Sequence, residues 1–163
     1  MADNSNIDFL LQLKQDLIDF INSTMDAAVS AFELSGGEIT SIDVPLLGHT
    51  NFFKGRKPTA VIFSDGRECV VSKWKSVAQV ILEDCFNDSA CRIRLLKLRE
   101  KVSGRSRTIL SSDSTAMDSP IEITDGLFME SKFDTETLLN VLIDKVLTPA
   151  GYNVTGISIR INL

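Results

Sequence analysis

The stretch KPTAVIFSDGRECVVSKWKSVAQVILEDCF, residues 57–86, decides the fold class because it joins two strand patterns to one helix pattern. Residues 59–63 are rich in β-branched and aromatic side chains, which favour a strand. The pair Asp65-Gly66 suits a tight hairpin turn, since both residue types tolerate positive φ angles. Apolar residues at helical spacing then predict a helix over 74–86. A hairpin followed by a helix is typical of an α+β domain.

A second Asp-Gly pair predicts a second hairpin further along the chain. Asp125-Gly126 lies between the apolar runs 121–123 and 127–129. A helical pattern follows from about Asp134, and Pro149 ends it because proline cannot continue a helix. The order of strand, turn, strand and helix therefore occurs twice.

Two further elements complete the predicted domain. A helix is expected over 88–102, and Gly104 follows its end. Isoleucines alternate with polar residues over 157–161, which is the pattern of a half-buried strand. We therefore predict an α+β fold whose globular domain, 59–163, contains two β-hairpins, three helices and a C-terminal strand.

The N-terminal segment has a different pattern. Residues 7–32 contain no proline or glycine, and their apolar residues recur at steps of three and four, which predicts a long amphipathic helix within 1–35. A connection rich in glycine and proline is expected over 36–58, with one short extended piece around Ile39 to Val44. The residues that we expect on one apolar stripe are Leu10, Leu13, Leu17, Ile21, Met25 and Phe32.

This predicted helix is long for a chain of this size. About 26 residues extend about 40 Å at 1.5 Å per residue. Its apolar stripe then has two explanations: it lies across the globular part as an ordinary core helix, or it pairs with a second copy. We favour pairing, and we expect a homodimer.

The charges are unevenly distributed along the chain. Residues 54–107 hold 13 of the 17 basic residues and 6 of the 22 acidic residues, a local charge of +7 against a total of −5. Such a basic centre can mark a nucleic-acid surface. It can equally be neutralised by the acidic flanks when the chain folds.

The basic centre supplies the candidate binding residues. Positive side chains can neutralise phosphates, and a nearby aromatic ring can stack on a base. Trp74, however, begins an apolar helical stripe, so we expect it in the core. The candidates are Arg92, Arg94, Lys97, Arg99, Lys101, Arg105, Arg107, Lys73 and Lys75.

The loop after the predicted helix 88–102 offers an alternative binding feature, an anion pocket. Arg105 and Arg107 flank one serine, and further hydroxyl groups are near in the sequence. The serines that could join the two arginines are Ser103, Ser111 and Ser112.

One short motif suggests an alternative, enzymatic function. Glu130 and Lys132 lie on the same face of a predicted strand, with Asp118 or Asp125 upstream. Two carboxylates that hold Mg²⁺, with a lysine that orients a water, are the pattern of metal-dependent nucleases. The proline-aspartate pair that usually begins this pattern is absent, and the motif equally suits a solvated hairpin edge.

Composition limits the other possibilities. The single histidine, His49, and three scattered cysteines lack the spacing of a zinc site, and no glycine-rich phosphate loop is present, so we expect no metal and no cofactor. The odd number of cysteines favours reduced thiols. The acidic N-terminus and the lack of an apolar run of about 20 residues favour a cytoplasmic protein without membrane contact.

The globular part also resembles a known module. Residues 57–162 resemble the uncharacterised C-terminal module of bacterial proteins with a ParB-like nuclease domain, of the modification-dependent restriction type. This resemblance implies a non-catalytic, sensing part; the nuclease region of that family is missing here, and the N-terminal helix takes its place. The matching residues are 58–63, Asp65-Gly66, 72–75, Gly104-Arg105, 119–121, Glu130, Asp134-Thr135 and 150–152.

These observations favour a binding protein over an enzyme. We expect a dimeric, non-enzymatic protein of a bacterium or mobile element that engages nucleic acid or a protein partner through its basic central surface. One alternative is a phage-type inhibitor of a host defence nuclease, an anti-restriction or anti-CRISPR protein whose acidic flanks imitate nucleic acid. The other is a Mg²⁺-dependent nuclease that uses Glu130 and Lys132.

Overall fold

A computed structural model describes residues 4–34, 40–104, 108–124 and 126–163, and the chain divides into two units. The first unit, Met1–Thr40, contains helix α1 (Asn4–Leu34). On α1, glutamine amides donate to aspartates one turn later, as in Gln12 to Asp16 at 2.8 Å. The second unit, Ser41–Leu163, mixes helices with antiparallel sheets, which confirms the α+β class.

A four-stranded antiparallel sheet forms one side of the second unit. Its strands are ordered β1-β7-β2-β3. The predicted first hairpin is confirmed, since β2 and β3 pair through Val61 and Cys69. Its turn differs from the expected Asp-Gly turn: the Phe63 amide donates to the Arg67 oxygen across three loop residues, and Gly66 has a positive φ of +85° whereas Asp65 does not. The predicted closing strand is β7, which pairs with β1 on one side and β2 on the other. The strands span β1 (Ser41–Pro45), β2 (Pro58–Ile62), β3 (Glu68–Val70) and β7 (Ser158–Asn162).

The predicted connection 36–58 does more than connect. Ser41–Pro45 is the edge strand β1, which pairs in register with β7, and the following 3-10 helix η1 (Thr50–Phe53) places Phe53 in the core with no exposed surface. The compact unit therefore begins at Ser41 and not at residue 59. The prolines and glycines of this segment separate β1, η1 and the start of β2, and both strands then pair with β7.

A second, three-stranded sheet has the order β4-β6-β5. Gly126 adopts φ +73° between β5 and β6, which pair antiparallel, so the second predicted hairpin is also confirmed. Asp125 lies outside the described residues. The strands span β4 (Leu110–Ser111), β5 (Pro120–Thr124) and β6 (Leu127–Glu130), and the 3-10 helix η2 (Ser114–Ala116) precedes β5.

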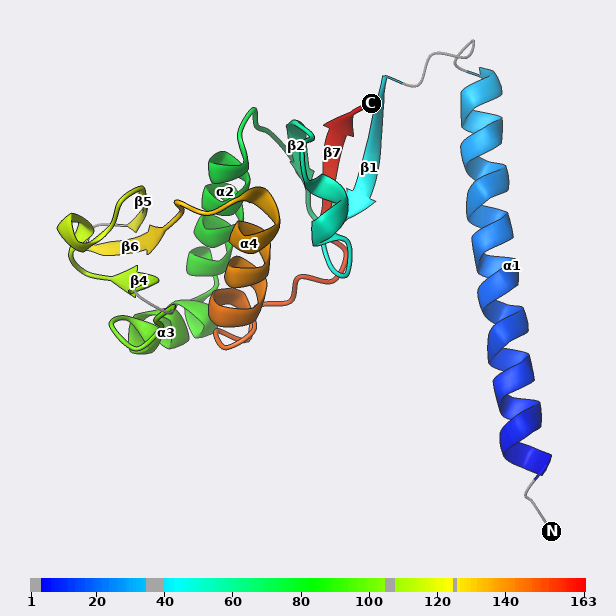
Figure 1. Cartoon of the computed structure of the whole chain (residues 1–163), viewed down its shortest axis with the longest axis horizontal. Helices are drawn as coiled ribbons and strands as arrows, with labels where there is room; N and C mark the ends of the chain where they lie inside the picture. Colours follow the sequence, from blue (N-terminus) through cyan, green and yellow to red (C-terminus); the bar gives the residue numbers. More distant parts are fainter. Residues whose placement is uncertain (1–3, 35–39, 105–107, 125) are drawn as a thin grey trace. The chain divides into compact units, whose positions relative to one another are not determined.

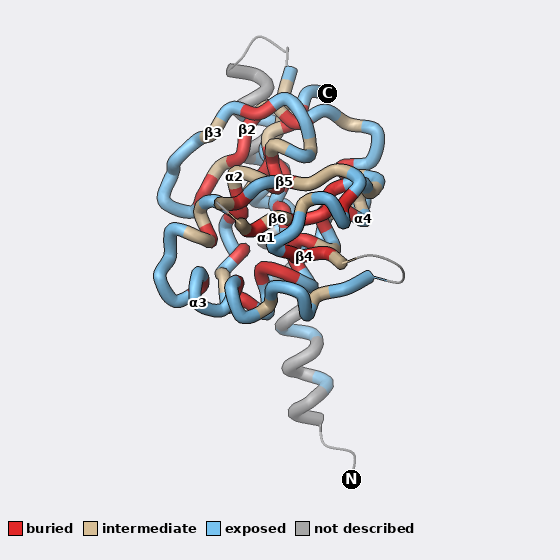
Figure 2. Tube along the Cα trace, turned by 90° about the vertical axis from the view of Figure 1, so that its left-hand side faces the viewer, coloured by how far each residue is buried: buried red, intermediate tan, exposed pale blue. Residues whose placement is uncertain are grey.

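The helices of this unit separate its two sheets. Figure 1 shows α2 (Trp74–Asn87) and α4 (Thr135–Asn140) between them, and α2 contacts both β2 and β5. Asp134 caps α4, which continues as the π-helix η3 (Val141–Leu147). In Figure 2 the buried stretches gather in the middle of the unit, while the chain around α3 (Ser89–Leu98) is largely exposed.

The helix predicted over 88–102 is shorter than expected. Asp88 caps α3 by accepting from the Cys91 amide at 2.8 Å, but the helix ends at Leu98. Arg99 leaves helical geometry with ψ 136°, and Glu100 adopts φ +61°. The backbone after α3 instead pairs with the chain before β4, because the Ile109 amide donates to the Val102 oxygen at 2.8 Å.

Candidate functional site

The most prominent charged feature is the α3 surface, which we define as Arg92, Lys97, Arg99 and Lys101. All four side chains are exposed, and α3 itself contains no acidic residue. In the part of the chain that the structure describes, none of the four forms an ion pair with a carboxylate. The Arg92 guanidinium lies 5.3 Å from the centroid of the Phe86 ring, and Arg92 is exposed.

The α3 surface also has an apolar part. Ile93 is 56% exposed and Leu96 is 41% exposed, three residues apart on the outer side of α3. The opposite side of α3 buries Cys91 and Leu95. A helix that buries one side and exposes both cations and apolar side chains on the other offers a mixed binding surface.

Glu100 is the one acidic residue among these cations, and its carboxylate is already bound. Hydrogen bonds from the Ser112 amide and hydroxyl, at 2.6 and 2.9 Å, and from the Ser111 hydroxyl hold it and lower the pKa of Glu100. Ser111 and Ser112, two of the serines predicted for the anion pocket, therefore already hold a carboxylate of the chain itself. Ser103 forms an isolated bridge with Thr108, and Arg105 and Arg107 lie outside the described residues.

Arg94 is not a free binding residue. Its Nε donates to the main-chain oxygen of Ala150 at 2.6 Å, and its guanidinium lies against Gly151, where an added Cβ would come within 2.8 Å. Arg94 therefore connects α3 to the segment that follows η3. The structure therefore gives Arg94 a structural contact, and its role in binding stays a prediction.

Lys73 and Lys75 lie away from the α3 surface. They flank Trp74 at the start of α2, whereas α3 follows the other end of this 14-residue helix, about 20 Å away at 1.5 Å per residue. Lys75 donates to the Ser119 hydroxyl at 3.2 Å. The structure therefore divides the predicted basic surface into two separate groups.

Trp74 packs as expected for a core residue. Its Nε1 donates to the main-chain oxygen of Arg56 at 2.8 Å, and its ring centroid lies 5.1 Å from that of Phe53. The Trp74 ring packs against Phe53 and its N–H group is already bonded, so Trp74 does not offer a free ring face on which a base could stack.

Glu130 is fully buried at the end of β6, and backbone amides surround its carboxylate. Asp118 and Lys132 donate to it at 2.6 and 2.7 Å, and further bonds come from Ser119 and Ser131. Burial raises the pKa of this carboxyl, but the four amide bonds outweigh burial and place the pKa below its ordinary value. Both oxygens of Glu130 are occupied, so this geometry does not suit a solvent-facing Mg²⁺ ligand.

The described residues of the nuclease motif form no group of metal ligands with Glu130. The Lys132 ammonium lies 3.3 Å from the Asp118 carboxylate in an exposed ion pair. Asp125 lies outside the described residues. Within residues 4–34, 40–104, 108–124 and 126–163, no three His, Cys, Asp or Glu side chains are grouped as metal ligands.

The predicted dimerisation stripe is only partly described. Ile21 is 51% exposed and Met25 is 60% exposed on α1. The side chains of Leu10, Leu13, Leu17 and Phe32 lie outside the described part. Other apolar side chains of α1 are exposed as well, namely Ile7, Leu11, Ile18 and Val29.

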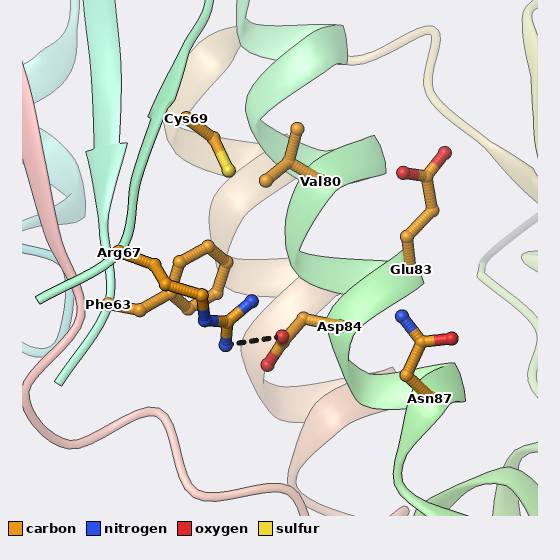
Figure 3. Close-up of a pocket in the computed structure, with 7 residues that line it drawn as sticks. All are labelled: Phe63, Arg67, Cys69, Val80, Glu83, Asp84 and Asn87. Atoms are coloured by element: carbon orange, nitrogen blue, oxygen red, sulfur yellow. Dashed lines mark hydrogen bonds and ion pairs between the residues drawn. The ribbon is translucent and has the colours of Figure 1, made fainter. Parts of the chain in front are cut away.

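A small hollow of about 150 Å³ lies between the β2–β3 hairpin and α2. Figure 3 shows Arg67 and Cys69 of the hairpin facing Val80 and Asp84 of α2. The Arg67 guanidinium lies 4.6 Å from the Phe63 ring centroid. This hollow was not anticipated from the sequence, because it depends on how the hairpin edge packs on the helix.

Comparisons with protein-family models, curated proteins and solved structures find no match for this chain. The resemblance to the module of ParB-like nuclease proteins therefore stays a prediction. No helix in the described part of the chain has the length and apolar character to cross a membrane.

Proposed function

We propose that this chain is a non-enzymatic binding protein that engages the acidic surface of a protein partner through the α3 surface. One observation carries the proposal: Ile93 and Leu96 are exposed among cations that have no carboxylate partner in the described residues. Protein interfaces combine an apolar centre with a polar rim, and arginine is enriched in them. An acidic partner would neutralise the rim and bury the two apolar side chains.

Nucleic acid is the second candidate partner. The exposed cations of the α3 surface, Lys97 and Arg99 among them, could neutralise phosphates, and this binding would weaken steeply with salt. The apolar pair Ile93 and Leu96 would contribute little to it. The two candidates therefore differ in how they depend on the apolar residues.

The test compares three double variants. Lys97→Glu with Arg99→Glu reverses two charges of the α3 surface, and Ile93→Ser with Leu96→Ser removes its apolar part. Partners are captured from a bacterial lysate and quantified by mass spectrometry, and labelled oligonucleotides are titrated by fluorescence anisotropy. Lys73→Glu with Lys75→Glu provides a control with the same charge change at the other end of α2.

A protein partner is lost with both α3 variants and retained with the control. Nucleic-acid binding is lost with the charge reversal alone and persists in the apolar variant. If all three variants retain the same partners as the unaltered chain, the α3 surface is not the binding surface and the proposal is wrong.

The cellular setting extends the same proposal. We propose that the protein acts in the cytoplasm and that a bacterium or a mobile element encodes it. A phage-type inhibitor of a host defence nuclease is a specific form of this proposal. A defence nuclease as the main captured protein would support that form. The buried, amide-bound Glu130 favours binding over Mg²⁺-dependent cleavage.

We also propose that α1 is a long amphipathic helix that pairs two copies of the chain. The exposure of Ile21 and Met25 supports this, because apolar side chains on a helix surface gain stability when a second helix covers them. The acidic first unit has one basic and seven acidic residues, whereas Ser41–Leu163 has 16 basic and 15. The α3 surface belongs to the second unit, so pairing through α1 and binding through α3 use different residues.

A further inference from the structure

The outer edge of β3 has backbone groups that find no partner among the described residues. β3 is the last strand in the order β1-β7-β2-β3. The Phe63 amide donates to Arg67 and the Val71 amide donates to Thr59, each at 2.9 Å. Since hydrogen-bonded and non-hydrogen-bonded pairs alternate in antiparallel strands, the amides and carbonyls of the residues opposite Ile62 and Ala60 point outward. Those residues are Glu68 and Val70.

No strand in the described part of the chain pairs with this edge, and Val70 is 86% exposed. Natural proteins usually protect such an edge, because it is a template for another strand. The Glu68 carboxylate accepts from Arg160 on the outer face of the sheet at 2.7 Å, so its side chain does not cover the edge. The backbone of β3 is therefore open to an added strand.

The hollow between the hairpin and α2 lies directly beside this edge. Side chains alternate along a strand, so Cys69 points to the side opposite Glu68 and Val70, where it lines the hollow with Val80 of α2 (Figure 3). A strand added about 4.8 Å outside β3 would direct every second side chain toward α2. One of those side chains would meet the hollow.

The hollow has room for a single side chain and is too small for most small-molecule ligands. About 150 Å³ is below the range of roughly 300–1,000 Å³ that is usual for small-molecule sites. It is open at the surface beside the hairpin, and its lining combines apolar atoms of Phe63 and Val80 with the charged groups of Arg67, Glu83 and Asp84. A long side chain with an apolar stem and a polar end suits that combination.

The charges of the hollow favour a basic occupant. Asp84 already accepts from the Arg67 guanidinium at 2.7 Å and from the Tyr152 hydroxyl at 2.5 Å. Glu83 accepts only from the neutral amide of Gln79, at 3.0 Å, among the described residues. Within the described part of the chain, the Glu83 carboxylate therefore has no positive partner.

We propose that the outer edge of β3 binds an extended peptide segment of a partner protein by strand addition, and that one lysine or arginine of the segment enters the hollow beside Glu83. The backbone of Glu68 and Val70 supplies the hydrogen bonds, and the hollow supplies the selectivity. This surface is separate from the α3 surface, so it is tested without reference to the function proposed above.

The first experiment uses a short synthetic peptide as the probe. Its sequence alternates valine and threonine with one central lysine, its ends are acetylated and amidated, and a matched peptide carries glutamate in place of lysine. Backbone amide signals of the full chain are followed by NMR during titration. The lysine peptide is expected to shift the Glu68 and Val70 signals, to slow the exchange of both amides, and to bind about tenfold more tightly than the glutamate peptide.

The second experiment removes the outward amide of β3. Val70→Pro deletes that donor, and proline is tolerated on an edge strand when its nitrogen faces outward. Val70→Thr is the matched control, because it keeps the amide and a β-branched side chain. Binding of the lysine peptide is expected to fall about tenfold or more with proline and to change less than about twofold with threonine.

Two further measurements keep the outcome clear. If Val70→Pro does not fold, a lysine peptide with N-methyl groups on its β3-facing amides tests the same hydrogen bonds on the unaltered chain. Glu83→Lys is expected to reverse the preference so that the glutamate peptide binds more tightly than the lysine peptide. Weaker binding of the N-methylated peptide and a reversed preference in Glu83→Lys would together show that the backbone edge and the hollow form one site.

Three results would overturn the proposal. The first is equal peptide binding by folded Val70→Pro and the unaltered chain. The second is the lack of any lysine-peptide binding at millimolar concentration. The third is a dimer in the absence of peptide that Val70→Pro abolishes, because a second copy would then cover this edge.

Discussion

Arg94 of α3 donates a hydrogen bond from Nε to the main-chain oxygen of Ala150 at 2.6 Å, and its guanidinium lies against Gly151. A charged donor satisfies a carbonyl that follows the end of η3, directly before Gly151, where the chain leaves helical geometry with φ +71°. Arg94 is thereby distinguished from Arg92, whose guanidinium lies over the Phe86 ring. Arg94 therefore connects α3 to the segment after η3, whereas Arg92 contacts an aromatic ring of α2.

Arg94→Ala is therefore expected to lower the free energy of unfolding by about 1 kcal/mol, since it removes a charge-assisted hydrogen bond and exposes the Ala150 carbonyl. Lys97→Ala, on the exposed side of the same helix, should change it by less than about 0.5 kcal/mol. Urea unfolding followed by circular dichroism measures both. Equal losses of stability in the two variants would show that the Ala150 contact contributes nothing.

The hairpins were predictable from the sequence because their signals are local. Asp65-Gly66 and Asp125-Gly126 each lie between strand-forming runs, and Gly66 and Gly126 adopt the positive φ angles that such turns require. The start of the compact unit was not predictable in this way. Ser41–Pro45 becomes a strand through its pairing with β7, more than a hundred residues later, and no local pattern records that partner.

The candidate site was predictable in composition but not in arrangement. The sequence shows a basic centre, yet it does not show that Arg94 is bonded to Ala150 or that Ser111 and Ser112 hold Glu100. These are tertiary contacts between side chains and a distant backbone. For the same reason, Glu130 could be read as a metal ligand from its spacing to Lys132.

Glu130→Gln tests the structural role of the buried carboxylate. A neutral amide cannot accept four hydrogen bonds, and its own N–H groups would face backbone donors. The free energy of unfolding is expected to fall by about 3 kcal/mol. Glu122→Gln, an exposed change of the same chemistry on β5, should cost less than about 0.5 kcal/mol, and denaturant titration compares the two.

The same carboxylate predicts a pH dependence. Its pKa is below the ordinary value in the folded chain, so the unfolded chain binds more protons in mild acid. The stability that Glu130 contributes is complete above the unfolded pKa of about 4.3 and is lost as the pH falls toward the folded pKa. Unfolding midpoints between pH 6 and pH 3 should therefore fall less in Glu130→Gln than in the unaltered chain; parallel profiles would contradict this role.

Dimerisation through α1 is tested by charge placement. Ile21→Asp with Met25→Asp puts two carboxylates on the exposed apolar stripe, where burial against a second helix would be costly. Asn22→Asp with Ser23→Asp adds the same charge at neighbouring exposed positions. Sedimentation equilibrium should give a dimer mass for the unaltered chain and the control, and a monomer mass for the first variant. A monomer in every case would remove the pairing proposal.

The three free thiols should react at different rates. Cys85 and Cys91 are both buried. Burial, and secondly the neighbouring Cys91, raises the pKa of the Cys85 thiol to about 12. Cys69 is half-buried and lines the hollow beside β3. Because the thiolate is the reactive form, iodoacetamide at neutral pH should label Cys69 first, as measured by peptide mass spectrometry. Faster labelling of Cys85 would contradict the packing around α2.

Tyr152 provides a spectroscopic test of the packing between α2 and the segment after η3. Burial raises the pKa of its phenol, and its hydroxyl donates to the Asp84 carboxylate at 2.5 Å, which raises the pKa further. Tyr152 is the single tyrosine of the chain, so the phenolate absorbance reports this group alone. In denaturant it should titrate near pH 10, whereas in the folded chain it should stay neutral well above that pH.

The sign of the linkage follows from this raised pKa. The stability that the neutral phenol contributes is complete below pH 10 and is lost as the pH rises toward the folded pKa. Tyr152→Phe should lower the free energy of unfolding by about 1 kcal/mol at neutral pH, because Asp84 loses a donor, and the difference should shrink in alkali. Ionisation of Tyr152 near pH 10 in the folded chain would show that its hydroxyl faces water and not Asp84.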